Sequence, residues 1–337
     1  MKAGKSRSRT AALVLQIGAV FALGAAHVQG SSTGPLPGGP AGSGPDPPAA
    51  TADGAGESPG FTLVEVSPSA VVARHPYGAN ITCIALDGGL IFLDAGMSTE
   101  TAARFRRAME KRFDRKTTAL LLTHAHIDHF LGMGAFSDVA VVAAEAGRDL
   151  FEKQLKIEFD ETRIEAYTRI FPKFRDAIGS AKPFLPTLWF KEQITFGGAG
   201  GRLIFTHTGG HSSCSSFAHF EPEGVIVAGD LVQVDQYPYF GDPSTDLQAW
   251  IGTLARWETM KIAGIAPGHG RIVGCDYIPR VRRFFEEMIS TLKQLKAEGV
   301  PEEEAVRHPR LPKRYWDDDL PEPKWWPSCI VSLYRSL

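Results

Sequence analysis

The stretch that decides the fold is Thr123-His124-Ala125-His126-Ile127-Asp128-His129. A short apolar strand is expected over 119–123 and runs directly into it. Two histidines that are two residues apart on an extended backbone point to the same side, and the turn that follows brings Asp128 and His129 to a second point nearby. A hydrophobic core has no use for three imidazoles and a carboxylate together. The stretch therefore indicates a metal site at the end of a strand.

One stretch is not enough for a complete site, because catalytic zinc takes about three protein ligands and keeps one position for water. Three later candidates each follow an apolar run and have a glycine close by, which lets the backbone approach the site: His211, Asp230 and His269. Imidazole and carboxylate ligands without a thiolate suit zinc, iron or manganese. We therefore expect four separate stretches of chain to meet around metal.

The order of these motifs resembles the metallo-β-lactamase superfamily in its glyoxalase II-like form. The resemblance rests on HxHxDH, a later Gly-His, a Gly-Asp after a strand, and Pro-Gly-His-Gly. It includes Asp94 after the apolar run 91–93, which is similar to the first motif of the family. It covers roughly residues 60–290 and implies an α/β fold, a four-layer αβ/βα sandwich with metals at one edge between two sheets.

The resemblance also implies the role of each site residue. One metal would be held by His124, His126 and His211, and the second by Asp128, His129 and His269. Asp230 would bridge both metals, and Asp94 would orient a ligand from behind. Asp128 would also orient the nucleophile or pass its proton.

A hydrolase follows from this ligand set. Two divalent ions, zinc first with iron or manganese as alternatives, would lie ~3.5–4 Å apart and lower the pKa of bound water from about 15.7 towards ~7. The bridging hydroxide is expected to attack a carbonyl ester, thioester, lactone or amide, so the expected partner is a small-molecule substrate. No serine or cysteine lies in a G-x-S-x-G turn that would supply another nucleophile.

Three other activities stay open at this stage. A β-lactamase suits an exported chain, although Asp230 matches the bridging acid of the glyoxalase-like branch. A phosphodiesterase suits two metals, but the segment between Asp230 and His269 is too short for the insertion domain of RNA-processing nucleases. An oxidoreductase that resembles the mononuclear iron persulfide dioxygenases is the third. A metal-stabilised binding protein is disfavoured, because no ligand of the set is missing.

The N-terminal residues predict export. Basic residues before position 10 precede an uncharged stretch over 11–26, which is typical of a signal peptide at 1–30, with an uncleaved membrane anchor as the alternative. Residues 31–58, rich in Gly, Pro and Ala, predict a disordered linker. We therefore expect a periplasmic or secreted protein. A net charge of −2 gives no reason to expect a nucleic-acid partner.

The remaining chain divides into a catalytic domain over 59–299 and a Pro- and Trp-rich extension over 300–337. Hydrophobic spacing predicts strands over 61–66, 80–86, 90–94, 119–123, 139–143, 202–206, 224–228 and 262–266, and helices over 98–113, 247–260 and 277–298. Two amphipathic helices are expected in an insert over 148–185, as a lid over the substrate or as a dimer contact.

The cysteines and one further histidine are weaker candidates. Four cysteines permit disulfides in an exported chain, and isolated buried thiols are the alternative. Cys214 is close to His211 in sequence but is not needed as a ligand, and His207 is a candidate for orienting a ligand.

Overall fold

The computed structural model describes residues 60–75, 78–158, 161–170, 175–176, 179, 181–198, 201–221, 223–312, 320 and 322–337. The predicted signal peptide and linker, at 1–30 and 31–58, lie outside the described residues. Among the helices of the described part, none has the length and apolar character needed to cross a bilayer.

A mixed seven-stranded sheet forms the first half of the molecule. Its strands lie side by side in chain order: β1 (Thr62–Ser67), β2 (Ala70–Arg74), β3 (Ile81–Leu86), β4 (Gly89–Leu93), β5 (Thr117–Leu121), β6 (Ala140–Ala144) and β7 (Leu188–Phe190). The first four are antiparallel, and β4 to β7 are parallel. Parallel neighbours end at the same edge of a sheet, and the HxHxDH stretch begins just after β5.

A five-stranded sheet forms the second half. In spatial order it consists of β12 (Gly264–His269), β11 (Val225–Gln233), β10 (Ser216–Glu221), β9 (Gly201–His207) and β8 (Gln193–Gly198). Only β11 and β12 are parallel. This pair carries Asp230 and His269.

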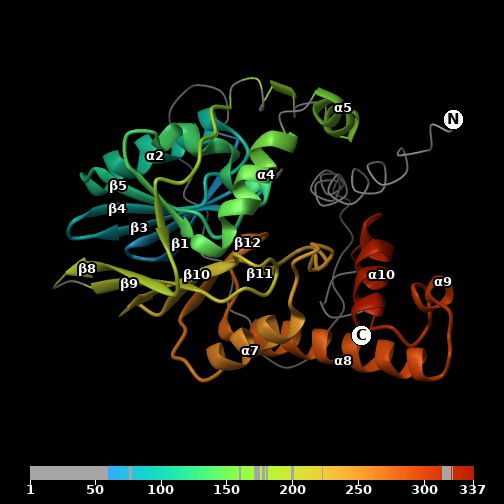
Figure 1. Cartoon of the computed structure of the whole chain (residues 1–337). Helices are drawn as coiled ribbons and strands as arrows, with labels where there is room; N and C mark the ends of the chain where they lie inside the picture. Colours follow the sequence, from blue (N-terminus) through green and yellow to red (C-terminus); the bar gives the residue numbers. More distant parts are fainter. Residues whose placement is uncertain are drawn as a thin grey trace, which may run out of the picture.

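The helices cover the outer faces of the two sheets. Their bounds are α2 (Thr99–Phe113), α3 (Ile127–Phe130), α4 (Arg148–Glu158), α5 (Glu161–Ile170), α7 (Leu247–Trp257), α8 (Ile278–Ala297), α9 (Glu302–Ala305) and α10 (Trp326–Ser336). Short 3₁₀ turns occur at Leu131–Phe136, Glu145–Gly147 and Cys275–Tyr277. The two sheets face each other, with α2 and α4 on one outer side and α7 and α8 on the other (Figure 1). The predicted αβ/βα sandwich is therefore confirmed.

Alternation along β11 shows why two cores form. Val225 and Val227 belong to the core that includes the first sheet, whereas Ile226 and Ala228 belong to the core under α7 and α8. All four side chains are at most 4% exposed. Successive side chains of a strand point to opposite faces, so a central strand buried on both faces is apolar throughout. This explains why the apolar run at 224–228 is continuous in the sequence.

Local signals set the ends of α2. The side chain of Ser98 accepts a hydrogen bond from the backbone N–H of Thr101, which satisfies one of the free donors of the first turn. Phe105 and Met109, four residues apart, are buried against the first sheet. The helix ends at Asp114, whose φ of 49° lies in the left-handed region. The predicted helix over 98–113 is confirmed.

The described part of the insert over 148–185 contains α4 and α5 where helices were predicted, and α4 is anchored. Phe151 of α4 is 1% exposed and packs edge-to-face on Phe130 and Trp189 at centroid distances of 5.4 and 5.9 Å. In α5, Ile164 is buried while Glu161 and Glu165 are exposed. The part that includes α4 is thus a fixed wall next to α3. Movement of the insert over a substrate stays a hypothesis.

The described part of the extension over 300–337 packs into the second core. Trp325, Trp326 and Cys329 are each at most 4% exposed, and they belong to the same cluster as the buried faces of α7 and α8. In Figure 1, α10 stands beside the end of α8. The segment that the sequence set apart is therefore part of the same hydrophobic unit as the second sheet.

Several elements differ from the sequence expectations. The strands β2, β7, β8 and β10 were not expected, and α7 ends at Trp257, three residues before the predicted end at Met260. The backbone N–H groups of Thr259 and Met260 bond to the carbonyls of Arg256 and Trp257, three residues back, so the chain tightens into a turn there and the α-helix ends. All four cysteines are free, so the alternative of isolated thiols is the correct one; Cys83, Cys214 and Cys329 are buried.

Candidate metal centre

Seven side chains from four stretches of chain meet at the edge where the two sheets come together. Their metal-binding atoms form two groups, and within each group all of these atoms lie within 4.8 Å of one another. The first cluster is His124, His126, His211 and Asp230. The second cluster is Asp128, His129 and His269. Every residue that the sequence predicted as a ligand is therefore in one of the two clusters, although its role as a ligand stays a prediction.

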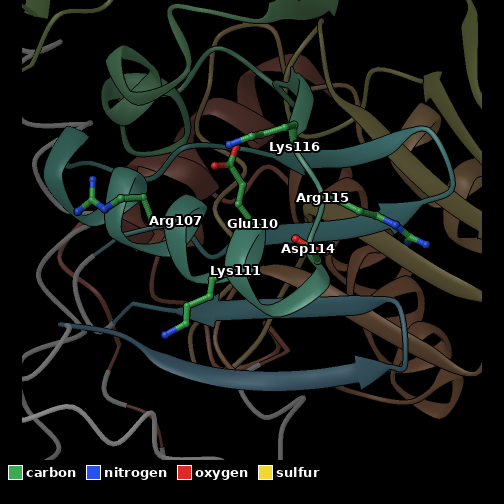
Figure 2. A pocket seen from close by; sticks show the side chains of 6 residues that line it. All are labelled: Arg107, Glu110, Lys111, Asp114, Arg115 and Lys116. Carbon is green, nitrogen blue, oxygen red and sulfur yellow. The ribbon is translucent and has the colours of Figure 1, made fainter.

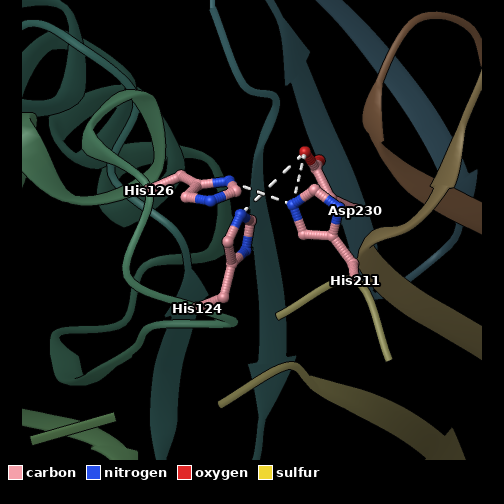
Figure 3. A group of neighbouring side chains, drawn as sticks. All are labelled: His124, His126, His211 and Asp230. Carbon is pink, nitrogen blue, oxygen red and sulfur yellow. Dashed lines mark hydrogen bonds and ion pairs between the residues drawn. The ribbon is translucent and has the colours of Figure 1, made fainter. Parts of the chain in front are cut away.

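The first cluster is compact. Nδ1 of His126 lies 3.0 Å from Nε2 of His211, and this nitrogen lies 3.5 Å from Oδ2 of Asp230. Nε2 of His124 is 3.9 Å from the same carboxylate oxygen. Figure 3 shows the three rings and the carboxylate pointing toward a common point.

The second cluster uses the other oxygen of the same acid. Oδ1 of Asp230 is 3.2 Å from Nε2 of His129 and 3.5 Å from Nε2 of His269. That nitrogen of His269 also lies 3.1 Å from Oδ2 of Asp128. Asp230 therefore presents one oxygen to each cluster, as a bridging carboxylate would.

The backbone brings these groups close by means of glycine. An added Cβ at Gly268 would lie 2.0 Å from Oδ1 of Asp230, so any larger residue there would collide with the shared carboxylate. At Gly229 a Cβ would lie 2.7 Å from the side chain of Thr123, and φ is +51°. This conformation interrupts the pairing of β11 with β12 and places Asp230 inside the strand instead of at its end.

A short helix separates the ligands of the HxHxDH stretch between the clusters. His126 lies at the N-cap of α3 with an extended backbone, and Asp128 and His129 lie on the helix itself. His124 and His126 thus point one way from the end of the strand, and the next turn carries the two later side chains to the second cluster.

Asp94 orients a ring of the second cluster. Its Oδ2 accepts a hydrogen bond from Nδ1 of His129 at 2.7 Å. Oδ2 also accepts a hydrogen bond from the hydroxyl of Thr123, and Oδ1 accepts one from the backbone N–H of Thr123, both at 2.8 Å. With Nδ1 occupied, His129 presents Nε2 to the cluster. Asp94 thus lies behind the ring of His129, and its predicted role in orienting a metal ligand stays a prediction.

The rings of the first cluster are oriented by other groups. Nδ1 of His211 donates to the carbonyl oxygen of Tyr239 at 2.9 Å, and Nδ1 of His124 lies 3.1 Å from the hydroxyl of Thr123. Nε2 of His126 lies 3.0 Å from Oδ2 of Asp242. Asp242 was not among the predicted site residues, because no spacing pattern in the sequence links this loop acid to a histidine 116 positions earlier.

The buried polar atoms fit a bound cation. Five atoms that face the centre of the clusters are buried and make no hydrogen bond: Nε2 of His124, His129 and His269, Oδ2 of Asp128 and Oδ1 of Asp230. Leaving such groups unpaired in the described structure is costly. Metal ions bound by nitrogen and oxygen donors would satisfy them, so the residues present suit divalent metals.

Electrostatics separate the two clusters. Burial lowers the pKa of His211 to about 4, even though the charge of Asp230 acts the other way. Burial and the neighbouring His129 likewise hold the pKa of His124 well below its usual range. Neutral imidazoles have free electron pairs, so both of these rings are suited to bind a cation at neutral pH.

In the second cluster the carboxylates dominate. Burial alone would lower the pKa of His129, but Asp230, Asp94 and Asp128 raise it well above its ordinary value. Burial would raise the pKa of the Asp230 carboxyl, yet His269 and His129 hold it well below its ordinary value. Without metal, protons on the histidines balance these carboxylates, so binding of a cation there displaces protons.

Asp242 stays ionised beside the first cluster. Burial would raise the pKa of its carboxyl, but hydrogen bonds with His126 and Ser244 hold the pKa well below the ordinary value. An ionised carboxylate only accepts hydrogen bonds. Its contact with His126 therefore makes Nε2 of that ring the donor.

The weaker candidates lie outside both clusters. Burial raises the pKa of the Cys214 thiol to about 11, and the side chain packs against Gly147, where a Cβ would lie 2.7 Å away. Nε2 of His207 lies 2.8 Å from the carbonyl oxygen of Ser213. Cys214 is thus a buried packing residue, and His207 supports the loop that carries His211 without touching a ligand ring.

A separate shallow pocket of about 320 Å³ lies at the C-terminal end of α2. Figure 2 shows that its side chains are charged: Arg107, Glu110, Lys111, Asp114, Arg115 and Lys116. None of the seven clustered residues lines it. Its acids and bases are mixed and no second feature points to a ligand, so we assign it no role.

A sequence profile described as "Metallo-beta-lactamase superfamily" matches residues 75–273. That range is more than half of the chain and contains all seven clustered residues. A comparison with curated proteins found no match in sequence.

Solved structures share the fold at low sequence identity. A metallo-beta-lactamase from Pontibacter korlensis is 17% identical with a TM-score of 0.52, and the match covers 67% of this chain and 99% of that one. The metallo-beta-lactamase IND-7 is 15% identical with a TM-score of 0.52, covering 67% and 98%. The stereoselective inverting sec-alkylsulfatase Pisa1 from Pseudomonas sp. is 20% identical with a TM-score of 0.60, covering 81% of this chain and 50% of that one.

Proposed function

This chain belongs to the metallo-beta-lactamase superfamily, and we propose that it is a hydrolase that binds two divalent metal ions and cleaves a carbonyl ester, thioester, lactone or amide. The observation that carries the proposal is the placement of Asp230, which offers Oδ2 to one buried cluster and Oδ1 to the other. A carboxylate divided between two sets of imidazoles is suited to hold two cations close together.

The residues divide the binding between them. His124, His126 and His211 would hold one ion, Asp128, His129 and His269 the other, and Asp230 both. When bound, two such ions supply a Lewis acid for the scissile group and a water molecule that ionises near neutral pH. Zinc is our first choice, with iron or manganese as alternatives, because no thiolate belongs to either cluster.

Asp128 has a second proposed role. Its Oδ2 is buried and makes no hydrogen bond, and the ring of His269 is 3.1 Å away. A carboxylate in this position can accept the proton that an attacking water molecule loses and pass it to the leaving group. The buried surroundings of the clusters exclude other water and strengthen these interactions.

Metal analysis of the purified full-length protein tests the metal content. We expect about two equivalents of zinc per chain. His219 serves as the matched control, because this histidine pairs with Glu221 on β10 and lies outside both clusters. His219→Ala should keep the full metal content, whereas His129→Ala should lose at least one equivalent. A single equivalent of iron in the unmodified protein would instead favour the persulfide dioxygenase alternative.

A substrate panel tests the reaction class. It should contain a thioester, a lactone, a β-lactam, bis(p-nitrophenyl) phosphate and a secondary alkyl sulfate, the last because a fold neighbour is described as a sec-alkylsulfatase. We expect turnover of a carbonyl substrate that is lost after chelation and restored by zinc. Turnover of only the phosphate or the sulfate ester would contradict the carbonyl assignment and keep the metal-dependent hydrolase.

A further inference from the structure

Asp242 lies on a loop that reaches the first cluster from the far end of β11. We call residues 239–246 the clasp segment. Oδ2 of Asp242 is 3.0 Å from Nε2 of His126, and the two side chains are 14% and 16% exposed. Of the candidate ligand rings, His126 is the most exposed, and the carboxylate of Asp242 lies within hydrogen-bond distance of it. The contact therefore orients the ring that packing holds least.

The other oxygen of Asp242 is already occupied. Oδ1 accepts hydrogen bonds from the backbone N–H of Ser244, at 2.7 Å, and from its hydroxyl. The carboxylate plane is thus fixed by its own turn, and Oδ2 is held toward His126. A carboxylate fixed in this way selects the ring nitrogen that carries the proton.

The opposite side of the His126 ring faces His211. Nδ1 of His126 is 3.0 Å from Nε2 of His211, as the dashed line in Figure 3 shows. His211 uses its own Nδ1 to donate to the carbonyl oxygen of Tyr239, so its Nε2 has a free electron pair. If His126 carries its proton on Nε2, the two neutral rings direct two electron pairs at the same point, which is the arrangement a cation needs.

The clasp segment also holds the backbone of His211. The hydroxyl of Thr245 donates to the carbonyl oxygen of His211 at 2.9 Å. The backbone N–H of Asp246 donates to the carbonyl oxygen of Gly210 at 2.8 Å. The backbone N–H of Ser213 donates to the hydroxyl of Ser244 at 3.0 Å. One loop therefore orients two of the three histidines of the first cluster.

We propose that Asp242 is a positioning residue that keeps the proton of His126 on Nε2, so that Nδ1 faces the first cluster with a free electron pair. The inference rests on the proposed function in one respect, since it takes the first cluster to be a metal site. Asp242 itself belongs to neither cluster. It acts through the orientation and the tautomer of His126.

The variant Asp242→Asn gives the sharpest test. The backbone N–H and the hydroxyl of Ser244 both donate to Oδ1, so the amide oxygen of asparagine takes that place. The amide nitrogen is then directed at Nε2 of His126 and needs an acceptor there. The substitution therefore reverses the polarity of the contact and moves the proton of His126 to Nδ1. Asp242→Ala removes the acceptor without this reversal.

The tautomer can be measured without metal or substrate. In full-length protein with ¹⁵N-labelled histidine and no metal, at a pH alkaline enough for the His126 ring to be neutral, two-bond ¹⁵N–¹H correlations report which nitrogen of His126 carries the single proton, with assignment by His126→Gln. We expect the proton on Nε2 in the unmodified protein and on Nδ1 in Asp242→Asn. An Nδ1 proton in the unmodified protein, or an unchanged Nε2 proton in Asp242→Asn, would overturn the inference.

Metal affinity supplies the second measurement. Competition with a chromophoric chelator should show that Asp242→Asn weakens one of two zinc equivalents by about 10–100-fold, and Asp242→Ala by less than Asp242→Asn. Asp138→Asn, at a 64% exposed acid outside both clusters, should leave both equivalents unchanged. Equal losses in the two Asp242 variants would indicate a merely structural role and contradict the inference. If the unmodified protein binds no metal, the proposed function fails, while the tautomer experiment still decides the role of Asp242.

Discussion

The two clusters share Asp230 but are supported by different kinds of structure. The ring of His129 is fixed by Asp94, which follows β4 and is held by the backbone and hydroxyl of Thr123 after β5. These three residues are at most 2% exposed. The ring of His126 is fixed by Asp242, on a loop between β11 and α7, and both side chains are partly exposed. The second cluster is thus built into the sheet, whereas the first is completed by a loop.

If each cluster binds a metal ion, as proposed, this difference means that the two ions should not be held equally. Adjacent strands of one sheet hold Asp94 and Thr123 in place, so orienting His129 needs no loop to be ordered. The first cluster depends on the clasp segment, whose order costs conformational entropy. We therefore expect the metal of the second cluster to be retained longer under chelation.

The largest effect is expected from Asp230→Asn, which should weaken metal binding at both clusters and so remove the difference between them. The shared carboxylate contributes an oxygen to each cluster, and an amide lacks its charge. The loss of affinity should exceed the ~10–100-fold that removal of an outer partner costs, and it should affect both zinc equivalents. Metal analysis after gel filtration measures it. Retention of both ions at unchanged affinity would show that Asp230 does not bridge them.

Asp94→Asn should weaken the second cluster selectively. The change disturbs three buried hydrogen bonds, including the one that fixes Nδ1 of His129. We expect one zinc equivalent to bind about 10–100-fold more weakly and the free energy of unfolding to fall by about 1–3 kcal/mol. Chelator competition and urea denaturation measure the two effects. This variant is the counterpart of Asp242→Asn. If both variants lost the same zinc equivalent, Asp94 and Asp242 could not each support a different cluster.

Trp325→Leu should affect only the first cluster, and more modestly. Trp325 packs edge-to-face on Tyr239 at 5.3 Å, and the carbonyl of Tyr239 orients His211. Such a ring pair contributes about 0.5–1.5 kcal/mol, so the weaker zinc equivalent should lose at most about tenfold in affinity. Unfolding will also become easier, because the tryptophan is 2% exposed. Chelator competition below the unfolding temperature separates the two effects, and an effect on both equivalents would refute the selectivity.

The smallest effect is expected from Asp138→Asn. The side chain is 64% exposed and pairs with Arg106. Exposed ion pairs contribute about 0–1 kcal/mol, so the unfolding temperature should change by only a few degrees and neither metal affinity should change. Differential scanning calorimetry with and without zinc measures this. A change in either metal affinity would show that the two clusters respond to charge at a distance.

The candidate ligands could be predicted because they carry a local signal. HxHxDH, Gly-Asp and Pro-Gly-His-Gly each combine a metal-binding side chain with an adjacent strand or glycine. The structure brings all seven residues into two clusters, and Asp94 lies behind His129. The central strands were equally visible, because β4 and the runs 119–121 of β5 and 225–228 of β11 are buried and continuously apolar.

The support of the first cluster could not be predicted. Asp242 acts on a histidine 116 positions away, and only the folded chain brings the two together. The strand β8 is an edge strand with polar and glycine residues, so it lacks the apolar run that marks a buried strand. The C-terminal extension was predicted only as a Pro- and Trp-rich segment, because its tryptophans follow neither a helical nor a strand period in the sequence. That they pack against α8 is visible only in the folded chain.

The extension has a practical consequence for anyone who shortens this chain. A protein ended at residue 299 keeps every candidate ligand, yet it uncovers aromatic rings that Trp325 and Trp326 cover, among them Tyr239 and Phe240. A newly bared apolar area of this kind promotes self-association. Poor solubility of such a fragment would then result from the loss of the tryptophans that cover these rings. It would say nothing about the chemistry of the candidate ligands that remain.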